Sequence, residues 1–204
     1  MIDMVEAYSS FANMGYKVHR HFIDRVEDKE GNVLYQFQND EDTILNSNLT
    51  FILNEMLTYT YDTAFINYNY PTVISLLPKI TNKYAIKTGT TDTDLWIIGY
   101  NKNVVTAIWN GYDDNRKVNK EDNGYHKNIW IDAMESYLKD MDNEWYSIPE
   151  NVVGCLVNPI SGVIAGEGEK NAKIFYFLKG TEPNYMNRDL ESVFKSENEK
   201  RVAS

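Results

Sequence analysis

The sequence has few of the residues on which several classes of protein depend. Its 204 residues include one cysteine and three histidines, so an internal disulfide framework is excluded and a metal site has few soft ligands to use. Acidic side chains outnumber basic ones by 30 to 20, which argues against a nucleic-acid partner because phosphate neutralisation needs clustered Lys and Arg. No apolar run reaches the length of a membrane span, and no export signal opens the chain.

The chain does have enough apolar side chains for a globular core, at 43% hydrophobic and 13% aromatic residues. Its periodicity predicts helices near residues 3–12, 49–57 and 128–139, a hairpin of residues 21–27 and 32–37, a second hairpin of residues 152–157 and 163–165, and a strand at 173–178. The apolar faces predicted for the second and third helices are Leu49, Ile52, Leu53, Met56 and Leu57, and Ile129, Trp130, Ala133, Met134, Tyr137 and Leu138. The single cysteine, Cys155, lies in an apolar run and is interpreted as a buried structural residue.

A β-branched run at residues 83–91 differs from the rest because it ends in Lys87, Thr88, Gly89 and Thr90. A strand edge with one cation, two hydroxyl groups and accessible backbone suits an extended ligand that ends in a carboxylate. Two more strand-like runs follow at residues 94–101 and 104–114, each after a short turn. The three runs therefore predict an antiparallel meander.

These runs resemble the C-terminal part of the transpeptidase domain of class A penicillin-binding proteins. The resemblance rests on five segments that occur in the family's order. From the N-terminus they are residues 4–15, Lys87-Thr88-Gly89-Thr90-Thr91, residues 96–100, residues 109–114 and residues 177–183. It implies an α+β fold, with an antiparallel β-sheet and flanking helices as in serine β-lactamases and DD-transpeptidases, of which this chain would be the C-terminal part only. Two positions depart from the pattern. Asp62-Thr63-Ala64 stands where relatives have Gly-Thr-Ala, and Ile86, where many have glycine, is predicted to point away from the binding groove.

The chemistry that the resemblance implies is acyl transfer, in a peptidoglycan DD-transpeptidase that cross-links stem peptides through a serine acyl-enzyme and binds penicillin. The implied catalytic residues are Lys87, which sets the local positive field, and Thr90, whose backbone N–H supplies half of the oxyanion hole. The implied substrate-binding residues are Lys87, Thr88, Gly89, Thr90 and Thr91, which hold the carboxylate of a D-Ala-D-Ala terminus or of a β-lactam. The resemblance implies no metal and no cofactor.

The nucleophilic serine of the family lies in a Ser-x-x-Lys motif that precedes this strand, and here no match does so. Ser136 and Lys139, and Ser192 and Lys195, have the right spacing but follow the strand, so both pairs are interpreted as surface residues. The chain is therefore expected to be a fragment that is inactive by itself. Its expected partners are stem peptides, β-lactams and the upstream half of the domain. The full-length protein is expected at the extracytoplasmic face of the bacterial cell membrane.

The sequence predicts three regions. Residues 1–143 form the C-terminal portion of the transpeptidase domain, residues 144–186 a small β appendage, and residues 187–204 a charged, disordered tail. Two alternatives remain open, namely a DD-carboxypeptidase or β-lactamase-like hydrolase, and a non-catalytic peptide-binding module. Residues 109–114 and 180–183 favour the transpeptidase.

Two further residue pairs could suggest a site. His19 and His21 are interpreted as packing or surface residues, because no third ligand lies near them in the sequence. Asp113 and Asp114 are interpreted as part of a turn.

Overall fold

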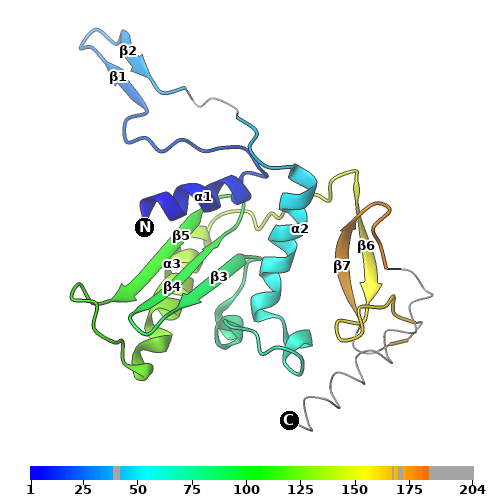
Figure 1. Ribbon diagram of the computed structural model, residues 1–204. Coiled ribbons are helices and arrows are strands. Elements are labelled where there is room, and N and C mark those ends of the chain that lie inside the picture. The colour runs from blue at the N-terminus through cyan, green and yellow to red at the C-terminus, as the bar shows by residue number, and fades with distance from the viewer. Residues whose placement is uncertain (39–41, 167, 170–171, 184–204) are drawn as a thin grey trace.

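The computed structural model describes residues 1–38, 42–166, 168–169 and 172–183. In chain order the elements are α1 (Ile2–Ala12), β1 (Arg25–Glu27), β2 (Val33–Gln36), α2 (Ser47–Thr58), η1 (Tyr59–Tyr61), η2 (Thr63–Phe65), η3 (Ile74–Lys79), β3 (Ala85–Thr90), β4 (Asp94–Tyr100), β5 (Val105–Gly111), η4 (Lys120–Gly124), α3 (Tyr125–Leu138), β6 (Val152–Val157) and β7 (Lys173–Leu178). Figure 1 shows a three-stranded sheet between helices, with the β1–β2 hairpin projecting from the body and the β6–β7 sheet beyond α2. None of the helices in these ranges is long and apolar enough to cross a membrane.

The central sheet has the order β3–β4–β5 and is antiparallel throughout, which confirms the predicted meander and the α+β class. Lys87 pairs with Ile98, and Ile97 pairs with Thr88 on one side and Ile108 on the other. Because directly opposed residues share a face of a sheet and neighbours along a strand do not, this register sorts the side chains into two sets. One set meets α3, and the other meets α1 and α2.

The α3 face is organised around Trp130, which is completely buried. Its indole ring lies over Gly99 so closely that a Cβ atom at Gly99 would be 2.3 Å from Cζ2. The indole N–H donates a hydrogen bond to the carbonyl of Thr106 at 3.0 Å, and the ring of Tyr84 packs edge-on at 5.3 Å. Ile86 is also buried in this core, so its side chain points into the protein as the sequence predicted.

The opposite face is joined to α1 and α2 by buried polar groups. The hydroxyl of Tyr100 donates to Oδ1 of Asn54 at 2.7 Å, and the amide of Asn54 donates to the carbonyl of Phe11 at 3.1 Å. The ring of Tyr8 packs edge-on against Tyr100. Asn54 therefore connects both helices to the sheet through hydrogen bonds that satisfy a completely buried side chain.

The apolar face that the sequence predicted for α2 is correct only in part, because Ile52, Leu53 and Leu57 are half-buried and Ile52 packs against a core cluster. Leu49 and Met56 are 54% and 55% exposed. The buried residues of the helix are Thr50, Phe51, Asn54, Glu55 and Thr58. Periodicity favoured the apolar side, whereas the fold buries polar side chains because the sheet and the neighbouring loops supply their hydrogen-bond partners.

The apolar face predicted for α3 is correct in part. Trp130, Met134 and Leu138 are buried as predicted, but Ile129, Ala133 and Tyr137 are exposed. The helix begins at Tyr125 and also buries His126 and Ile131, which the prediction did not include. The stripe that packs on the sheet is narrower than the apolar composition of the helix suggests.

The predicted pairing of residues 152–157 with 163–165 is correct only beside the turn, where the Asn158 N–H donates to the Val163 carbonyl at 3.0 Å and the Ala165 N–H donates to the Leu156 carbonyl at 2.9 Å. β6 pairs along its whole length with β7, and the shorter segment contributes one bridge between Val157 and Ile164. The turn that suggested the hairpin does exist, since the Asn158 side chain accepts from the backbone of Ile160 and Ser161. Val157 pairs with Lys173 of β7 as well as with Ile164, so the short segment and the six-residue β7 lie on opposite edges of β6.

The β1–β2 hairpin forms as predicted but with shorter strands, and every residue of both strands is exposed. Phe22 and Leu34 are 91% and 67% exposed. Gly31 closes its turn with a φ of +88°, a conformation that side chains disfavour. The predicted disordered tail, residues 187–204, lies outside the described residues.

Acid is expected to destabilise this fold through His126. The side chain is completely buried, and within the described part of the chain neither ring nitrogen has a hydrogen-bond partner. Burial, together with the charge of Lys127, lowers the pKa of His126. The unfolded chain takes up a proton near pH 6.5 while the folded chain resists it, so the free energy of unfolding should fall as the pH drops from 7.5 to 5.5.

Urea unfolding at the two pH values measures this effect. The His126→Phe variant should lose much of the acid sensitivity, whereas His21→Gln should keep it, because the pKa of the exposed His21 is raised by its hydrogen bonds to the His19 carbonyl and to Asp24. Equal acid sensitivity in wild type and His126→Phe would contradict this prediction.

Candidate functional site

β3 is an edge strand of the sheet, and within the described residues no strand pairs with its outer side, which we call the free edge. The Thr91 N–H donates to the Asp94 carbonyl at 2.9 Å, so alternation turns the backbone groups of residues 84, 86, 88 and 90 toward the free edge. The hydroxyl of Tyr61 agrees with this assignment, because it donates to the carbonyl of Tyr84 and accepts from its N–H. The N–H of Thr90 therefore points outward from the sheet.

Tyr61 remains a hydroxyl at neutral pH. Burial raises the pKa of Tyr61 to about 12, and the hydrogen bond to the Tyr84 backbone opposes part of that rise. The residue closes the free edge immediately before β3 begins. The edge is open for binding beyond this point.

The side chains at the end of β3 alternate between the two faces. Lys87 and Gly89 lie on the face shared with α1 and α2, and Thr88 and Thr90 lie on the α3 face. Lys87, Gly89 and Thr90 are exposed, and Thr88 is half-buried. The ammonium group of Lys87 donates to the Thr88 carbonyl at 2.6 Å, so the cation lies at the free edge itself.

A cation, two hydroxyl groups and an outward N–H thus gather within four residues. Such an arrangement can hold a carboxylate by charge-assisted hydrogen bonds and can stabilise an oxyanion that develops beside the strand. Gly89 leaves room for a ligand backbone on its face of the strand, since it carries no side chain.

Thr91 has a different position from the four residues before it. Its hydroxyl accepts hydrogen bonds from the N–H groups of Thr93 and Asp94 and so builds the β3–β4 turn. Hydrogen bonds from Thr93, then Trp109, then Thr91 lower the pKa of Asp94. The ionised carboxylate of Asp94 anchors this turn. Thr91 therefore stabilises the end of β3 through the turn.

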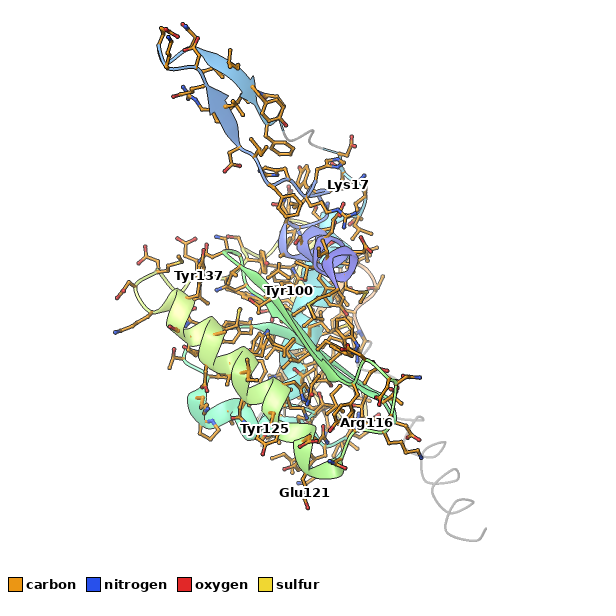
Figure 2. The ribbon with its side chains drawn as sticks, turned by 90° about the vertical axis from the view of Figure 1, so that its left-hand side faces the viewer. Lys17, Tyr100, Arg116, Glu121, Tyr125 and Tyr137 are labelled. Carbon is orange, nitrogen blue, oxygen red and sulfur yellow. The ribbon has the colours of Figure 1, made fainter. Side chains whose placement is uncertain are left out.

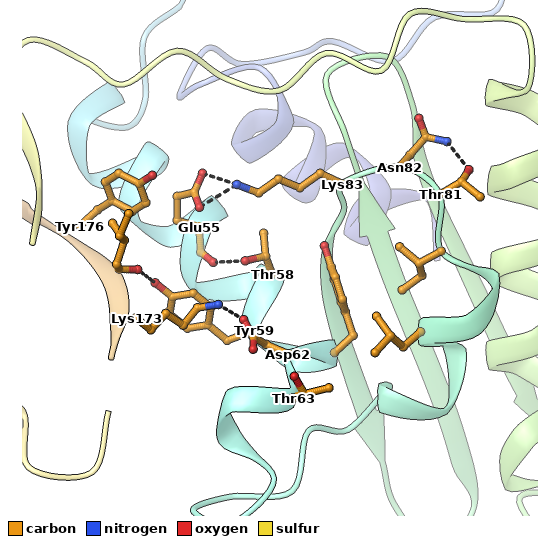
Figure 3. Close-up of a pocket in the computed structure, with 14 residues that line it drawn as sticks. Glu55, Thr58, Tyr59, Asp62, Thr63, Thr81, Asn82, Lys83, Lys173 and Tyr176 are labelled. Carbon is orange, nitrogen blue, oxygen red and sulfur yellow. Dashed lines mark hydrogen bonds and ion pairs between the residues drawn. The ribbon is translucent and has the colours of Figure 1, made fainter. Parts of the chain in front are cut away.

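A cleft of about 660 Å³ lies between α2, β7 and the segment that leads into β3 (Figure 3). The buried carboxylate of Glu55 accepts two hydrogen bonds from the Lys83 ammonium, both at 2.8 Å, and one from the Trp145 indole at 2.5 Å. On the other side of the cleft Lys173 forms an ion pair with Asp62. Residues 87–91 do not line this cleft. Its two ion pairs join the segment before β3 to α2, through Lys83 and Glu55, and β7 to Asp62, which caps η2.

The other residues considered from the sequence lie away from the free edge. Ser136 is exposed on α3, and the residue that follows it, Tyr137, lies at the opposite end of the sheet from Arg116 (Figure 2). The side chain of Ser192 lies outside the described residues. Asp113 and Asp114 form a turn after β5, as predicted.

His21 and Cys155 also have structural surroundings. His21 stacks on Phe37 and contacts Asp24. Cys155 is half-buried in β6, less than predicted, and burial raises its thiol pKa. Among the described residues no group of three or more His, Cys, Asp or Glu side chains could hold a metal ion.

Sequence reasoning missed Tyr61, Glu55 and Lys83, although all three position the start of β3. Tyr61 lies in a segment without periodicity, and Glu55 looks like an ordinary polar residue of an amphipathic helix. Lys83 precedes Lys87 by four residues, yet only the fold brings it to Glu55. No local signal marks these contacts, because Tyr61 is 23 residues from Tyr84 and Glu55 is 28 residues from Lys83.

No family model matches the sequence. Penicillin-binding protein 2D of Bacillus subtilis is 37% identical over 183 residues, which are 89% of this chain and 26% of that protein. Penicillin-binding protein 1A of Aquifex aeolicus is 30% identical over 196 residues, 94% of this chain and 26% of that protein. The chain thus spans about a quarter of the length of these curated relatives. The crystal structure of penicillin-binding protein 1A from Haemophilus influenzae superposes with a TM-score of 0.79 and 21% identity, covering 90% of this chain and 32% of that one.

Proposed function

We infer that this chain is part of the transpeptidase domain of a class A penicillin-binding protein, and we propose that it supplies the strand that clamps the donor peptide in a peptidoglycan DD-transpeptidase. The observation that carries the proposal is the free edge of β3, where the Lys87 ammonium and the outward N–H of Thr90 lie within four residues of each other. The full-length protein would act at the extracytoplasmic face of the cell membrane, where peptidoglycan is built.

In the proposed complex the donor stem peptide lies along the free edge in an extended conformation. Lys87 and the hydroxyl groups of Thr88 and Thr90 hold the carboxylate of its D-Ala-D-Ala terminus, and Gly89 lets its backbone approach. A β-lactam would place its own carboxylate at the same position. Thr91 acts indirectly, by holding the turn that ends the strand.

The reaction itself needs a serine nucleophile, which attacks the carbonyl of the penultimate D-Ala and releases the terminal D-Ala. The N–H of Thr90 would stabilise the oxyanion during this attack, and an acceptor amine would then take the acyl group from the serine. Ser136 is exposed on α3, and its neighbour Glu135 contacts Thr81 and Tyr84, which precede β3 and so lie away from residues 87–91. We assign the nucleophile to a Ser-x-x-Lys segment beyond these 204 residues.

Two measurements test the proposal. Incubation of the purified chain with a fluorescent penicillin should yield no covalent adduct on a denaturing gel or by intact mass. Titration of the ¹⁵N-labelled chain with N,N-diacetyl-L-Lys-D-Ala-D-Ala should shift the amide signals of residues 86–91. The Lys87→Met variant should bind this peptide about tenfold more weakly, because the charge-assisted hydrogen bond to the carboxylate is lost.

Lys102→Met is the matched control, since Lys102 is a partly exposed lysine at the far turn of the same sheet, in an ion pair with Glu144. It should leave peptide affinity unchanged. A stoichiometric adduct with penicillin would place the nucleophile in this chain and overturn the assignment. Peptide affinity that survives in Lys87→Met would refute the clamp.

A further inference from the structure

The segment from residue 63 to residue 78 contains no charged side chain, although a quarter of the whole chain is charged. Its middle carries two tyrosines, Tyr68 and Tyr70, alternating with Asn67 and Asn69. All four side chains are exposed, and the tyrosines are 64% and 67% accessible. Large aromatic rings held in water without a packing partner commonly mark a binding surface.

This segment is held in place on both sides of the tyrosines. Before them, Phe65 packs against the ring of Tyr59 at 5.0 Å and that of Phe175 at 6.0 Å. After them, the ammonium group of Lys127 donates to the carbonyl of Thr72 at 2.9 Å, and Val73 is completely buried. The two rings are therefore displayed on an anchored loop, so binding would cost little ordering entropy.

The anchored loop lies beside the proposed clamp. It follows almost directly after Tyr61, whose hydroxyl closes the free edge at Tyr84, and Figure 1 shows it just beyond the end of α2. A polymer whose peptide branch lies along β3 would therefore pass this loop.

We propose that Tyr68 and Tyr70 form a platform for the glycan strand of the same substrate, with Asn67 and Asn69 bonding its hydroxyl and acetamido groups. A sugar ring has an apolar C–H face that packs on an aromatic ring and a polar rim that needs both donors and acceptors, which amide side chains supply. The lack of charge along the loop fits a neutral polymer. This inference rests on the proposed function, because the substrate there is peptidoglycan.

The test uses tetra-N-acetylglucosamine as the glycan probe, titrated into the ¹⁵N-labelled 204-residue chain. The amide signals of residues 66–70 should shift. The double variant Tyr68→Ala/Tyr70→Ala should bind about tenfold more weakly, and Tyr68→Phe/Tyr70→Phe should stay within about threefold of wild type, because the rings remain. Thermal unfolding midpoints should be the same for all of them, as expected for exposed side chains.

Tyr137→Ala is the matched control, because Tyr137 is 56% exposed near the C-terminal end of α3, ten residues along the helix from the Lys127 that contacts the loop. It should leave glycan binding unchanged. The platform is refuted if the probe shifts no signal in residues 66–70, if Tyr137→Ala weakens binding equally, or if the protein proves to use this surface for self-association in sedimentation experiments. Peptide titration of the alanine double variant separates the two proposals, since it reports on the clamp at Lys87 and should give wild-type affinity.

Discussion

Replacing Trp130 with alanine is expected to lower the free energy of unfolding by about 3–5 kcal/mol. The indole is completely buried between α3 and the sheet and fills the space above Gly99. Its removal leaves a cavity that the rigid strands cannot close, and it leaves the carbonyl of Thr106 without the indole N–H. Urea unfolding followed by far-ultraviolet circular dichroism measures the change.

Two control variants test whether the lost stability comes from the buried indole ring. Ile129→Ala changes the neighbouring residue of the same helix, which is 56% exposed, and should cost no more than about 0.5 kcal/mol. Trp130→Phe keeps an aromatic ring in the site and should lose clearly less stability than Trp130→Ala. A Trp130→Ala loss as small as that of Ile129→Ala would mean that α3 does not pack on the sheet as described.

The Lys83→Met change is expected to lower the free energy of unfolding by about 2 kcal/mol, because it removes the cation that pairs with the buried Glu55 carboxylate. The Lys83→Met variant would leave a carboxylate that is 7% exposed with the Trp145 indole as its remaining partner. A fully buried charge that loses its partner costs about 3–5 kcal/mol, but the lysine side chain is 38% exposed and so the loss is smaller. Urea unfolding at neutral pH gives the value.

A double-mutant cycle isolates the contribution of this ion pair. Glu55→Gln removes the buried charge, so adding Lys83→Met to it should cost less than Lys83→Met does in the wild type. The Lys102→Met change removes an ion pair whose carboxylate, on Glu144, is 62% exposed, and it should cost no more than about 1 kcal/mol. Additive losses in the cycle would show that Glu55 and Lys83 do not interact.

Local patterns were enough to predict the sheet. The three strands at residues 83–114 are close in sequence and joined by short turns, so their order and direction follow from β-branched composition and turn residues alone. The resemblance to penicillin-binding proteins drew attention to Lys87 through Thr91. Alternation along β3 then explains why the backbone of Thr88 and Thr90 faces the free edge, which the Lys87 ammonium reaches through the Thr88 carbonyl. The assignment of Thr91 to substrate binding stays a prediction, beside its role in the turn.

Long-range pairing was not visible in the same way. β6 pairs with a strand that begins 16 residues after its own end, and a nearer turn at Asn158 masked that partner. For α2, hydrophobic spacing favoured Leu49 and Met56, whereas Asn54 and Glu55 are buried because Tyr100, Lys83 and Trp145 meet them. A sequence cannot reveal such partners when they come from other parts of the chain.

The projecting β1–β2 hairpin is expected to unfold locally while the rest of the molecule stays folded. Its strands contact each other but contribute nothing to the buried core, and all seven of their residues are exposed. A two-stranded ribbon without a packed face is marginally stable by itself. Its amide protons should therefore exchange with solvent through local fluctuations that leave the sheet intact, and the hairpin and the core form separate cooperative units.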